Sequence, residues 1–142
     1  MIHESLFSSR SEEYGTPIEL YNQLNEEFHF TLDPCASKEN AKCQKYFTKQ
    51  EDGLKQSWDG ERVFMNPPYG KNIKEWMIKA SLSKALTVCL IHARTDTRWW
   101  WETVEKYSKE IRFIKGRLKF VGGKYSSTFP SVIVIFDNRE EI

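Results

Sequence analysis

Cysteine is scarce in this sequence, and the cysteines present form no familiar pattern. Cys35, Cys43 and Cys89 include no CxxC pair, and we expect no secretory leader. An odd, sparse set of this kind predicts reduced thiols and a cytoplasmic protein. A zinc site built from Cys35, Cys43 and a histidine fits no usual ligand spacing, so we expect no bound metal.

Long apolar runs are also missing from the chain. No stretch approaches the roughly 20 apolar residues of a membrane-spanning helix, so we expect no membrane partner. The sequence has 142 residues, of which 39% are hydrophobic and 29% are charged, as in an ordinary globular protein. We therefore expect one domain over residues 1–142, with residues 1–13 as a flexible arm.

The chain has no overall excess of charge, since its formal net charge is +1. Net charge therefore gives no argument for a nucleic-acid partner, but the charges are unevenly distributed. Residues 1–34 carry seven acids and one arginine, whereas residues 109–124 carry six bases and one acid. The basic segment can face phosphates or form a solvated surface, and charge alone favours neither.

Apolar patterning predicts strands that alternate with helices. The predicted strands are 29–33, 63–65, 87–93, 111–121 and 131–136. Helices are expected to begin near residues 16, 72 and 97, with a short helix over 39–45. The last two strands are bounded by turn residues and are expected to be antiparallel. This order predicts an open α/β sheet with a C-terminal antiparallel hairpin.

The predicted helices carry local signals at their starts and along their faces. Thr16 and Asn72 are each followed three residues later by glutamate, as in a capping box, and Pro17 suits a first helical position. In the third helix, residues 100, 104 and 107 have the spacing of a buried stripe. The tryptophans at 99–101 are consecutive, so one helix face cannot bury all of them and at least one should be exposed.

Two proline-containing segments follow predicted strands. Asp33-Pro34 ends the first strand, and Asn66-Pro67-Pro68-Tyr69 follows the second. In open α/β sheets, ligands bind beyond the carboxyl ends of the strands. We therefore expect both segments to face one crevice.

The segment Asn66–Tyr69 has the groups needed to hold an aromatic amine. Its two prolines remove two backbone donors, so the Asn66 side-chain oxygen and the next carbonyl can accept both hydrogens of an exocyclic amino group. The lone pair of that nitrogen can then attack the methyl group of a sulfonium cofactor. Tyr69 offers a ring for a flipped base, worth ~1–3 kcal/mol per stacked base. A rigid proline turn is the competing interpretation.

Several segments, in this order, resemble the phage-type DNA N6-adenine methyltransferase (Dam) family. They are YGTP at 14–17, FTLDPCAS at 30–37, DGL at 52–54, FMNPPYG at 64–70, RTDTRWW at 94–100 and GRLKF at 116–120. The resemblance implies a compact Rossmann-like, S-adenosylmethionine-dependent methyltransferase that acts on N6 of adenine in double-stranded DNA. It also implies the cytoplasm of a bacterial host or of a prophage-bearing cell.

The resemblance also implies roles for particular residues. The catalytic residues that it implies are Asn66, Pro67, Pro68 and Tyr69, and the cofactor contacts are Thr16, Pro17, Asp33, Pro34 and Asp52. The glycine-rich turn of many methyltransferases is absent after the first strand, so Asp33 can bind either the ribose or the methionine part of the cofactor. Helix capping for Thr16 and Pro17, and turn formation for Asp33 and Asp52, are the competing interpretations.

DNA contacts are expected from Arg94, Arg117 and Lys119. Arg94 follows the strand 87–93 and can hold a phosphate or the target base, or can pair with Asp96. Arg117 and Lys119 lie on the polar face of the predicted strand 111–121, where phosphate contact and solvation are both possible.

Three functions remain open from the sequence. The first is a DNA adenine methyltransferase, which Asn at the first position of the loop favours. The second is a methyltransferase of another amine, such as cytosine N4, RNA or protein glutamine. The third is a DNA-binding remnant without activity. No separate recognition domain fits into this length, so target recognition is expected from short loops near Asn72 or over 121–130.

Overall fold

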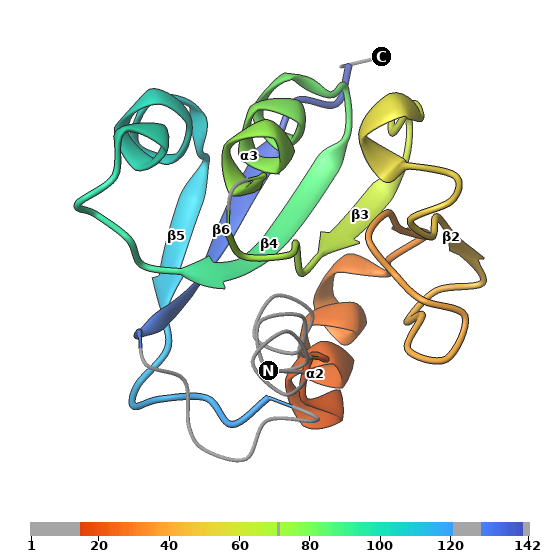
Figure 1. Ribbon diagram of the computed structural model, residues 1–142, viewed down its shortest axis with the longest axis horizontal. Coiled ribbons are helices and arrows are strands. Elements are labelled where there is room, and N and C mark those ends of the chain that lie inside the picture. Colours follow the sequence, from red (N-terminus) through yellow and green to blue (C-terminus); the bar gives the residue numbers. More distant parts are fainter. Residues whose placement is uncertain (1–14, 71, 121–128, 141–142) are drawn as a thin grey trace, which may run out of the picture.

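The structure is a computed structural model that describes residues 15–70, 72–120 and 129–140. In this part of the chain one mixed sheet lies between helices on its two faces (Figure 1). The strands are β1 (Leu32–Asp33), β2 (Lys45–Tyr46), β3 (Arg62–Met65), β4 (Leu86–His92), β5 (Glu110–Phe113) and β6 (Ser131–Asp137). The helices are α2 (Ile18–Phe28), η1 (Gly53–Lys55), α3 (Ile73–Leu82) and η2 (Trp100–Glu105).

The strand order in the sheet is β2-β1-β3-β4-β6-β5. The strands β2, β1, β3 and β4 are parallel to their neighbours, whereas β6 is antiparallel to both β4 and β5. It follows that β5 runs parallel to β4, with the reversed strand β6 between them. The predicted α/β fold with a mixed sheet and a C-terminal antiparallel pair is confirmed.

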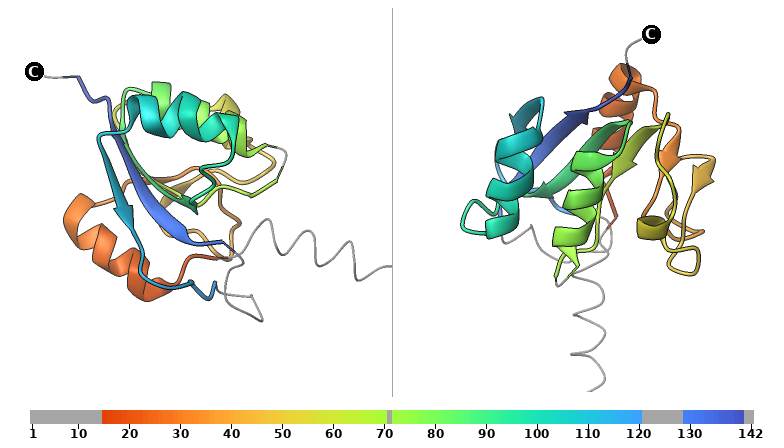
Figure 2. Two further views of the ribbon diagram at one scale, coloured as in Figure 1. Left: turned by 90° about the vertical axis from the view of Figure 1, so that its left-hand side faces the viewer. Right: turned by 90° about the horizontal axis from the view of Figure 1, so that it is seen from above.

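The central strand β4 separates the two layers of the core. Leu86, Val88 and Leu90 belong to the apolar cluster that includes the buried face of α2. Cys89 and Ile91, which alternate with them, belong to the cluster that includes α3 and η2. Figure 2 shows α2 on one side of the sheet and α3 with η2 on the other. Because both faces are covered, the strand is buried from Leu86 to Ile91, and Thr87 is the one polar residue in that run.

The start of α2 differs from its prediction. Pro17 occupies the N-cap position instead of the first helical position, and no side chain caps the helix. Thr16 lies one residue before the N-cap, and its hydroxyl instead accepts a hydrogen bond from the side chain of Asn66, 3.0 Å away. Asn72 is the N-cap residue of α3, but its side chain makes no capping bond either. A tertiary contact has therefore replaced the local one at Thr16.

The predicted helix over 39–45 is wrong. Residues 38–40 form a turn, and β2 then pairs in parallel with β1 without a helix between them. The pairing continues beyond the strands, where Ala36 and Phe47 share a backbone hydrogen bond of 3.0 Å. The segment has no apolar stripe to bury, and a helix this short is not stable by itself. Pairing with β1 decides the conformation at the end of the segment, where Lys45 lies opposite Leu32.

The segment Trp100–Glu105 forms a π-helix, where an α-helix was predicted. Trp100 and Val104 are buried as expected, but Tyr107 is 45% exposed. A π-helix has more residues per turn than an α-helix, so the third position of the predicted stripe rotates out of the core. Trp101 is 56% exposed, which confirms that the neighbouring tryptophans are not all buried.

Two predicted strands are shorter in the structure. The first begins only at Leu32, because His29 ends α2 in a left-handed conformation with a φ of 54°. The strand predicted over 111–121 ends at Phe113 and continues as irregular chain to residue 120. Residues 121–128, most of the predicted recognition connection, and the predicted arm 1–13 lie outside the described residues.

Candidate functional site

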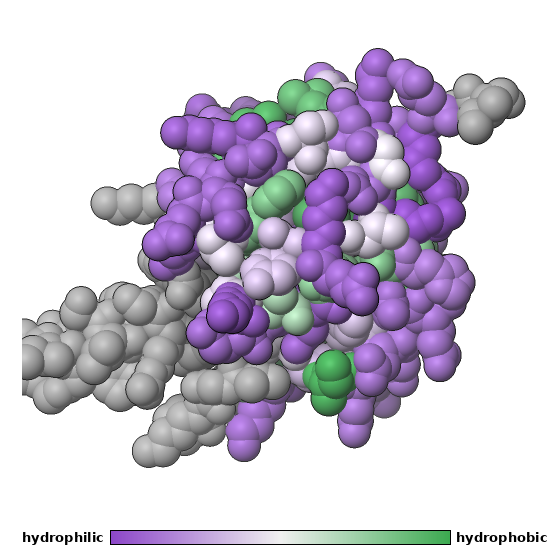
Figure 3. All heavy atoms as spheres, turned by 90° about the vertical axis from the view of Figure 1, so that its right-hand side faces the viewer, coloured by the Kyte–Doolittle hydropathy of each residue, from purple (hydrophilic) through white to green (hydrophobic). Residues whose placement is uncertain are grey.

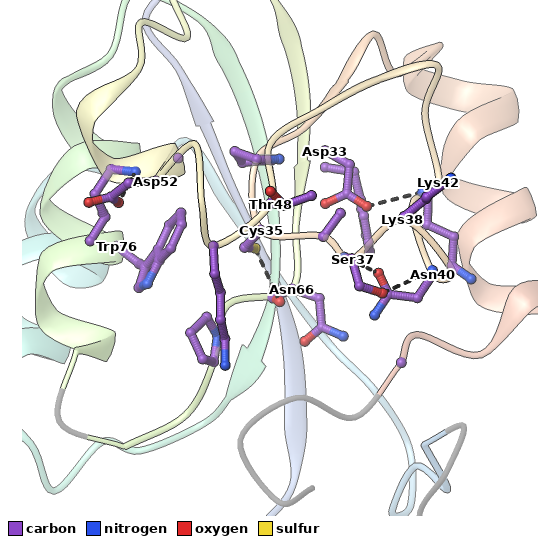
Figure 4. A pocket seen from close by; sticks show the side chains of 18 of the residues that line it. Asp33, Cys35, Ser37, Lys38, Asn40, Lys42, Thr48, Asp52, Asn66 and Trp76 are labelled. Atoms are coloured by element: carbon purple, nitrogen blue, oxygen red, sulfur yellow. Dashed lines mark hydrogen bonds between the residues drawn. The ribbon is translucent and has the colours of Figure 1, made fainter. Parts of the chain in front are cut away.

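A cavity of about 680 Å³ lies at the carboxyl ends of β1 and β3 (Figure 4). Its volume is in the range of small-molecule sites, and its position is the usual ligand site of an α/β sheet. Asp52 and Trp76 lie on one side of it, Asp33 on the other, and Asn66 between them. The segments Asp33-Pro34 and Asn66–Tyr69 therefore contribute to one crevice, as their positions in the sequence predicted.

Asp33 is the buried carboxylate of this cavity. Only 5% of the residue is exposed, and removal from water raises the pKa of Asp33 from 3.8 to about 6. The backbone N–H of Lys42 donates to its Oδ2 atom at 3.1 Å and offsets part of that increase. Near pH 7 the group is mostly ionised, so it can accept hydrogen bonds from hydroxyl or ammonium groups.

Asn66 is held by two segments that are distant in the sequence. Its Nδ2 atom donates to the hydroxyl of Thr16 at 3.0 Å, and Thr16 is only 3% exposed. Its backbone carbonyl accepts a hydrogen bond from the thiol of Cys35 at 3.2 Å. The side chain of Asn66 and the backbone beside it are therefore both fixed. Cys35 was not among the predicted site residues, and no sequence signal distinguished it from a buried thiol.

Asp52 lies at the cavity because the backbone at the next residue, Gly53, packs closely against the backbone of Pro34. A Cβ atom on the next residue, Gly53, would lie 2.0 Å from the carbonyl oxygen of Pro34. The carbonyl of Gly53 accepts a hydrogen bond of 3.0 Å from the indole of the fully buried Trp58. Asp52 itself has a φ of 57°, and its side chain caps η1 by accepting from Leu54 at 3.1 Å. Asp52 is thus both a turn residue and part of the cavity wall.

Tyr69 lies away from this cavity. Its hydroxyl donates to the carbonyl of Leu90 at 3.1 Å, and its ring stacks on His92 with 3.9 Å between centroids and 11° between planes. Burial raises the pKa of Tyr69 above its ordinary value. A second cavity of about 300 Å³ is lined by Tyr69, His92, Arg94 and Trp99 among others. The loop Asn66–Tyr69 therefore borders two cavities.

His92 is a site residue that the sequence reasoning missed. It is the last residue of β4, so it lies at the same edge of the sheet as the loop after β3. A polar, flat ring at the end of an otherwise apolar strand was the signal that could have found it.

Arg94 pairs with Asp96 in the structure. Two of its guanidinium nitrogens each lie 2.9 Å from a carboxylate oxygen of Asp96, and this pairing raises the pKa of Arg94. Its guanidinium also lies 4.4 Å from the ring centroid of Phe129. The ion pair considered from the sequence is therefore present, and contact with DNA stays a prediction.

Of the other predicted residues, two line the larger cavity, two line neither cavity, and two are exposed on the surface. Pro34 and Pro68 line the larger cavity, whereas Pro17 and Pro67 line neither cavity. Arg117 and Lys119 are exposed and also lie outside both cavities.

Figure 3 views the molecule from the side that carries β2, where hydrophilic residues cover most of the surface around a paler central area.

Residues 15–70, 72–120 and 129–140 contain neither a membrane-spanning helix nor a cluster of metal-binding side chains. No helix in these ranges has both the length and the apolar character needed to cross a membrane. The same ranges contain no group of three or more histidine, cysteine, aspartate or glutamate residues arranged to hold a metal ion.

A mixed sheet with one reversed strand defines a Rossmann-like α/β protein, and its cavity lies where such sheets commonly bind ligands. The profile of the family described as DNA N-6-adenine-methyltransferase (Dam) matches residues 5–141, nearly the whole sequence. The chain belongs to this family. The prediction of a phage-type methyltransferase enzyme is thereby confirmed.

Two phage proteins illustrate the similarity. The chain is 26% identical over 138 residues to the DNA N-6-adenine-methyltransferase of Haemophilus phage HP1 (strain HP1c1), covering 89% of this chain and 79% of that protein. It is also 26% identical over 131 residues to the DNA N-6-adenine-methyltransferase of Escherichia phage T1. That match covers 78% of this chain and 54% of the phage T1 protein, so it spans about half of the latter.

Proposed function

We propose that this protein transfers a methyl group from S-adenosylmethionine to N6 of adenine in double-stranded DNA, with the target base flipped out of the helix. The observation that carries the proposal is the position of the loop Asn66–Tyr69 between two cavities. Methyl transfer needs the donor and the acceptor to lie next to each other in a fixed orientation, which a residue at the junction of their two sites can provide. A loop of Asn, two prolines and Tyr at this junction meets that requirement.

The larger cavity suits S-adenosylmethionine in size and chemistry. We assign the cofactor to the residues Thr16, Asp33, Pro34 and Asp52, all of which line this cavity. The bound cofactor would supply an electrophilic methyl group on a positively charged sulfur. A buried, ionised Asp33 favours a ligand with positive charge and hydroxyl donors. Pro17 does not line the cavity, and we assign it to the start of α2.

Asn66 holds the target amine in this proposal. Its Nδ2 atom is bonded to Thr16, so Oδ1 serves as the acceptor end of the side chain. Together with the carbonyl of Pro67, Oδ1 accepts the two N–H groups of the adenine amine. Two accepted hydrogens favour a tetrahedral nitrogen whose lone pair is directed away from the ring. Pro67 and Pro68 add stiffness and no competing donors.

Tyr69 and the basic residues bind the DNA in this proposal. A base that leaves the helix needs a new stacking partner, which the Tyr69 ring provides. We assign Arg94 to the target nucleotide, because it lines the same smaller cavity as Tyr69. Arg117 and Lys119 lie on an exposed basic segment and contact backbone phosphates.

The proposal is tested by following the methyl group. The protein is incubated with unmethylated double-stranded DNA and S-adenosylmethionine that carries a tritiated methyl group, and the DNA is then hydrolysed to nucleosides. We expect the label to elute as N6-methyldeoxyadenosine. Label in N4-methylcytosine, in added RNA or in protein would establish a different acceptor. Absence of label and of cofactor binding, with duplex DNA still bound in an electrophoretic mobility assay, would establish a DNA-binding protein without activity.

A further inference from the structure

We infer that His92 is a positioning residue that sets the ring of Tyr69 for the stacked target base. The inference rests on the proposed function, because it requires a flipped base at Tyr69. In this role His92 takes no part in the methyl-transfer chemistry. It acts through the neighbouring ring of Tyr69.

The ring of Tyr69 is restrained in two ways. Its hydroxyl donates to the carbonyl of Leu90, which fixes the distal end of the side chain. One face is covered by His92 at a centroid separation of 3.9 Å and an interplanar angle of 11°, which is close to parallel stacking. A flat base that stacks on Tyr69 therefore takes the opposite face. The base, Tyr69 and His92 then form a stack of three rings.

His92 is itself supported by other rings. Phe129 lies 5.4 Å from it at a tilt of 40°, and Phe120 contacts it edge-on at 6.4 Å. The guanidinium of Arg94 covers the ring of Phe129 at 4.4 Å. His92 is therefore the link between the catalytic loop after β3 and the chain that leads into β6. This support lets an imidazole on β4 hold Tyr69 in one orientation.

The charge state of His92 agrees with a stacking role. Burial, and secondarily the nearby charge of Arg94, lowers the pKa of His92 from 6.5 to about 4. The imidazole is therefore neutral near pH 7, where it can stack without repelling Arg94. A group with so low a pKa is also a poor acceptor of protons from the substrate, which disfavours general-base catalysis.

Three variants separate the ring of His92 from its polarity. His92→Phe keeps a flat ring, His92→Asn keeps a polar group without a ring, and His92→Ala removes both. Methyl transfer from tritiated S-adenosylmethionine to unmethylated plasmid DNA is measured as kcat and KM for DNA, alongside cofactor affinity and the unfolding midpoint. We expect kcat/KM for DNA to fall about tenfold in His92→Asn and His92→Ala, the value of one lost aromatic pair, and to stay near wild type in His92→Phe. Cofactor affinity should not change.

Equal losses in His92→Phe and His92→Asn would overturn the inference, since they would indicate a role for the imidazole nitrogens. Wild-type activity in His92→Ala would overturn it as well. In either case a wild-type protein that methylates adenine leaves the proposed function intact. If the wild-type protein methylates no adenine, the proposed function fails and the inference fails with it.

A double variant tests whether His92 acts through Tyr69. In a Tyr69→Ala background the ring that His92 supports is missing, so His92→Ala should cause little further loss of kcat/KM. A residue with an independent structural role would reduce kcat/KM by the same factor in both backgrounds. That additive result would contradict the inference.

Discussion

The side chain of Asn66 donates from Nδ2 to the hydroxyl of Thr16 across 3.0 Å, although the two residues are separated by 50 positions in the sequence. This hydrogen bond joins the chain before α2 to the loop after β3, and both segments line the larger cavity. The proposed cofactor site and the proposed catalytic amide are therefore parts of one connected structure.

Removal of the Asn66 side chain should abolish most of the methyl-transfer activity and leave cofactor affinity nearly unchanged. In Asn66→Ala we expect kcat for DNA methylation to fall by about two orders of magnitude or more, because one acceptor for the amine is lost. Cofactor affinity, measured by equilibrium dialysis, should change only slightly. Asn22→Ala, on the exposed face of α2, is the matched control and should have wild-type kcat. A wild-type rate in Asn66→Ala would remove the catalytic assignment.

The hydroxyl of Thr16 should matter through its bond to Asn66. Thr16→Val keeps the side-chain volume but leaves Nδ2 of Asn66 without this acceptor, at a cost of about 1–3 kcal/mol. We expect kcat to fall about tenfold or more, and Thr16→Ser to restore it. Steady-state kinetics with both variants would check this. Equal rates for Val and Ser would show that the hydroxyl does not position Asn66.

Asp33 should make both stability and cofactor binding depend on pH. Its pKa rises from 3.8 in the unfolded chain to about 6 in the folded protein, so the folded state binds the proton more tightly. Stability therefore decreases as the pH rises from about 4 to about 6, by about 3 kcal/mol for a shift of roughly two pH units. In Asp33→Asn this contribution should disappear, and denaturant unfolding near pH 7 should show a more stable protein.

Cofactor affinity should change with pH in the opposite direction. Protonation of Asp33 below about pH 6 removes its negative charge, so we expect the Kd for S-adenosylmethionine to increase as the pH falls. Asp33→Asn should bind weakly at every pH, whereas Glu26→Gln on the exposed surface of α2 should behave as wild type. A pH-independent wild-type Kd would indicate that Asp33 is only a turn residue.

Gly53 should tolerate no larger residue. In Gly53→Ala the new Cβ atom would lie 2.0 Å from the carbonyl oxygen of Pro34, so we expect a loss of about 3 kcal/mol or more in unfolding free energy. Gly60→Ala is the control, because its Cβ meets nothing within 4 Å and only its φ of 80° is unfavourable. Its loss should be about 1 kcal/mol. Similar Tm values for the two variants would contradict the close approach.

The basic segment should contribute to the salt dependence of DNA binding. Arg117→Gln and Lys119→Gln should each weaken binding to all DNA sequences and reduce the slope of log Kd against log salt concentration by about one. Lys55→Gln, on an exposed lysine of η1, is the control. Fluorescence anisotropy with labelled duplexes at several salt concentrations measures the slope. An unchanged slope in both variants would remove these residues from the phosphate contacts.

The predictions from sequence failed where contacts distant in the chain outweighed local signals. The sequence pattern predicts a cap at Thr16, but α2 begins one residue later than this pattern requires, and the Thr16 hydroxyl accepts from Asn66 instead. The segment 39–45 was predicted to be helical, yet it forms a turn and an irregular stretch that ends at Lys45, which pairs with Leu32 of β1. The position of His92 at the end of a mostly apolar strand indicates the edge of the sheet, but its stacking on Tyr69, which follows another strand, could not be predicted from its own neighbours.

The amino-acid sequence by itself determined the buried strands β3, β4 and β6, the α/β class of the fold and the loop Asn66–Tyr69. These features depend on apolar runs and on proline, which act within a few residues. Only the tertiary structure decided which groups meet at the carboxyl edge of the sheet. Thr16 with Asn66, Gly53 with Pro34 and Tyr69 with His92 are pairs that the packing of the sheet and its connecting segments brings together, and no local pattern encodes such distances.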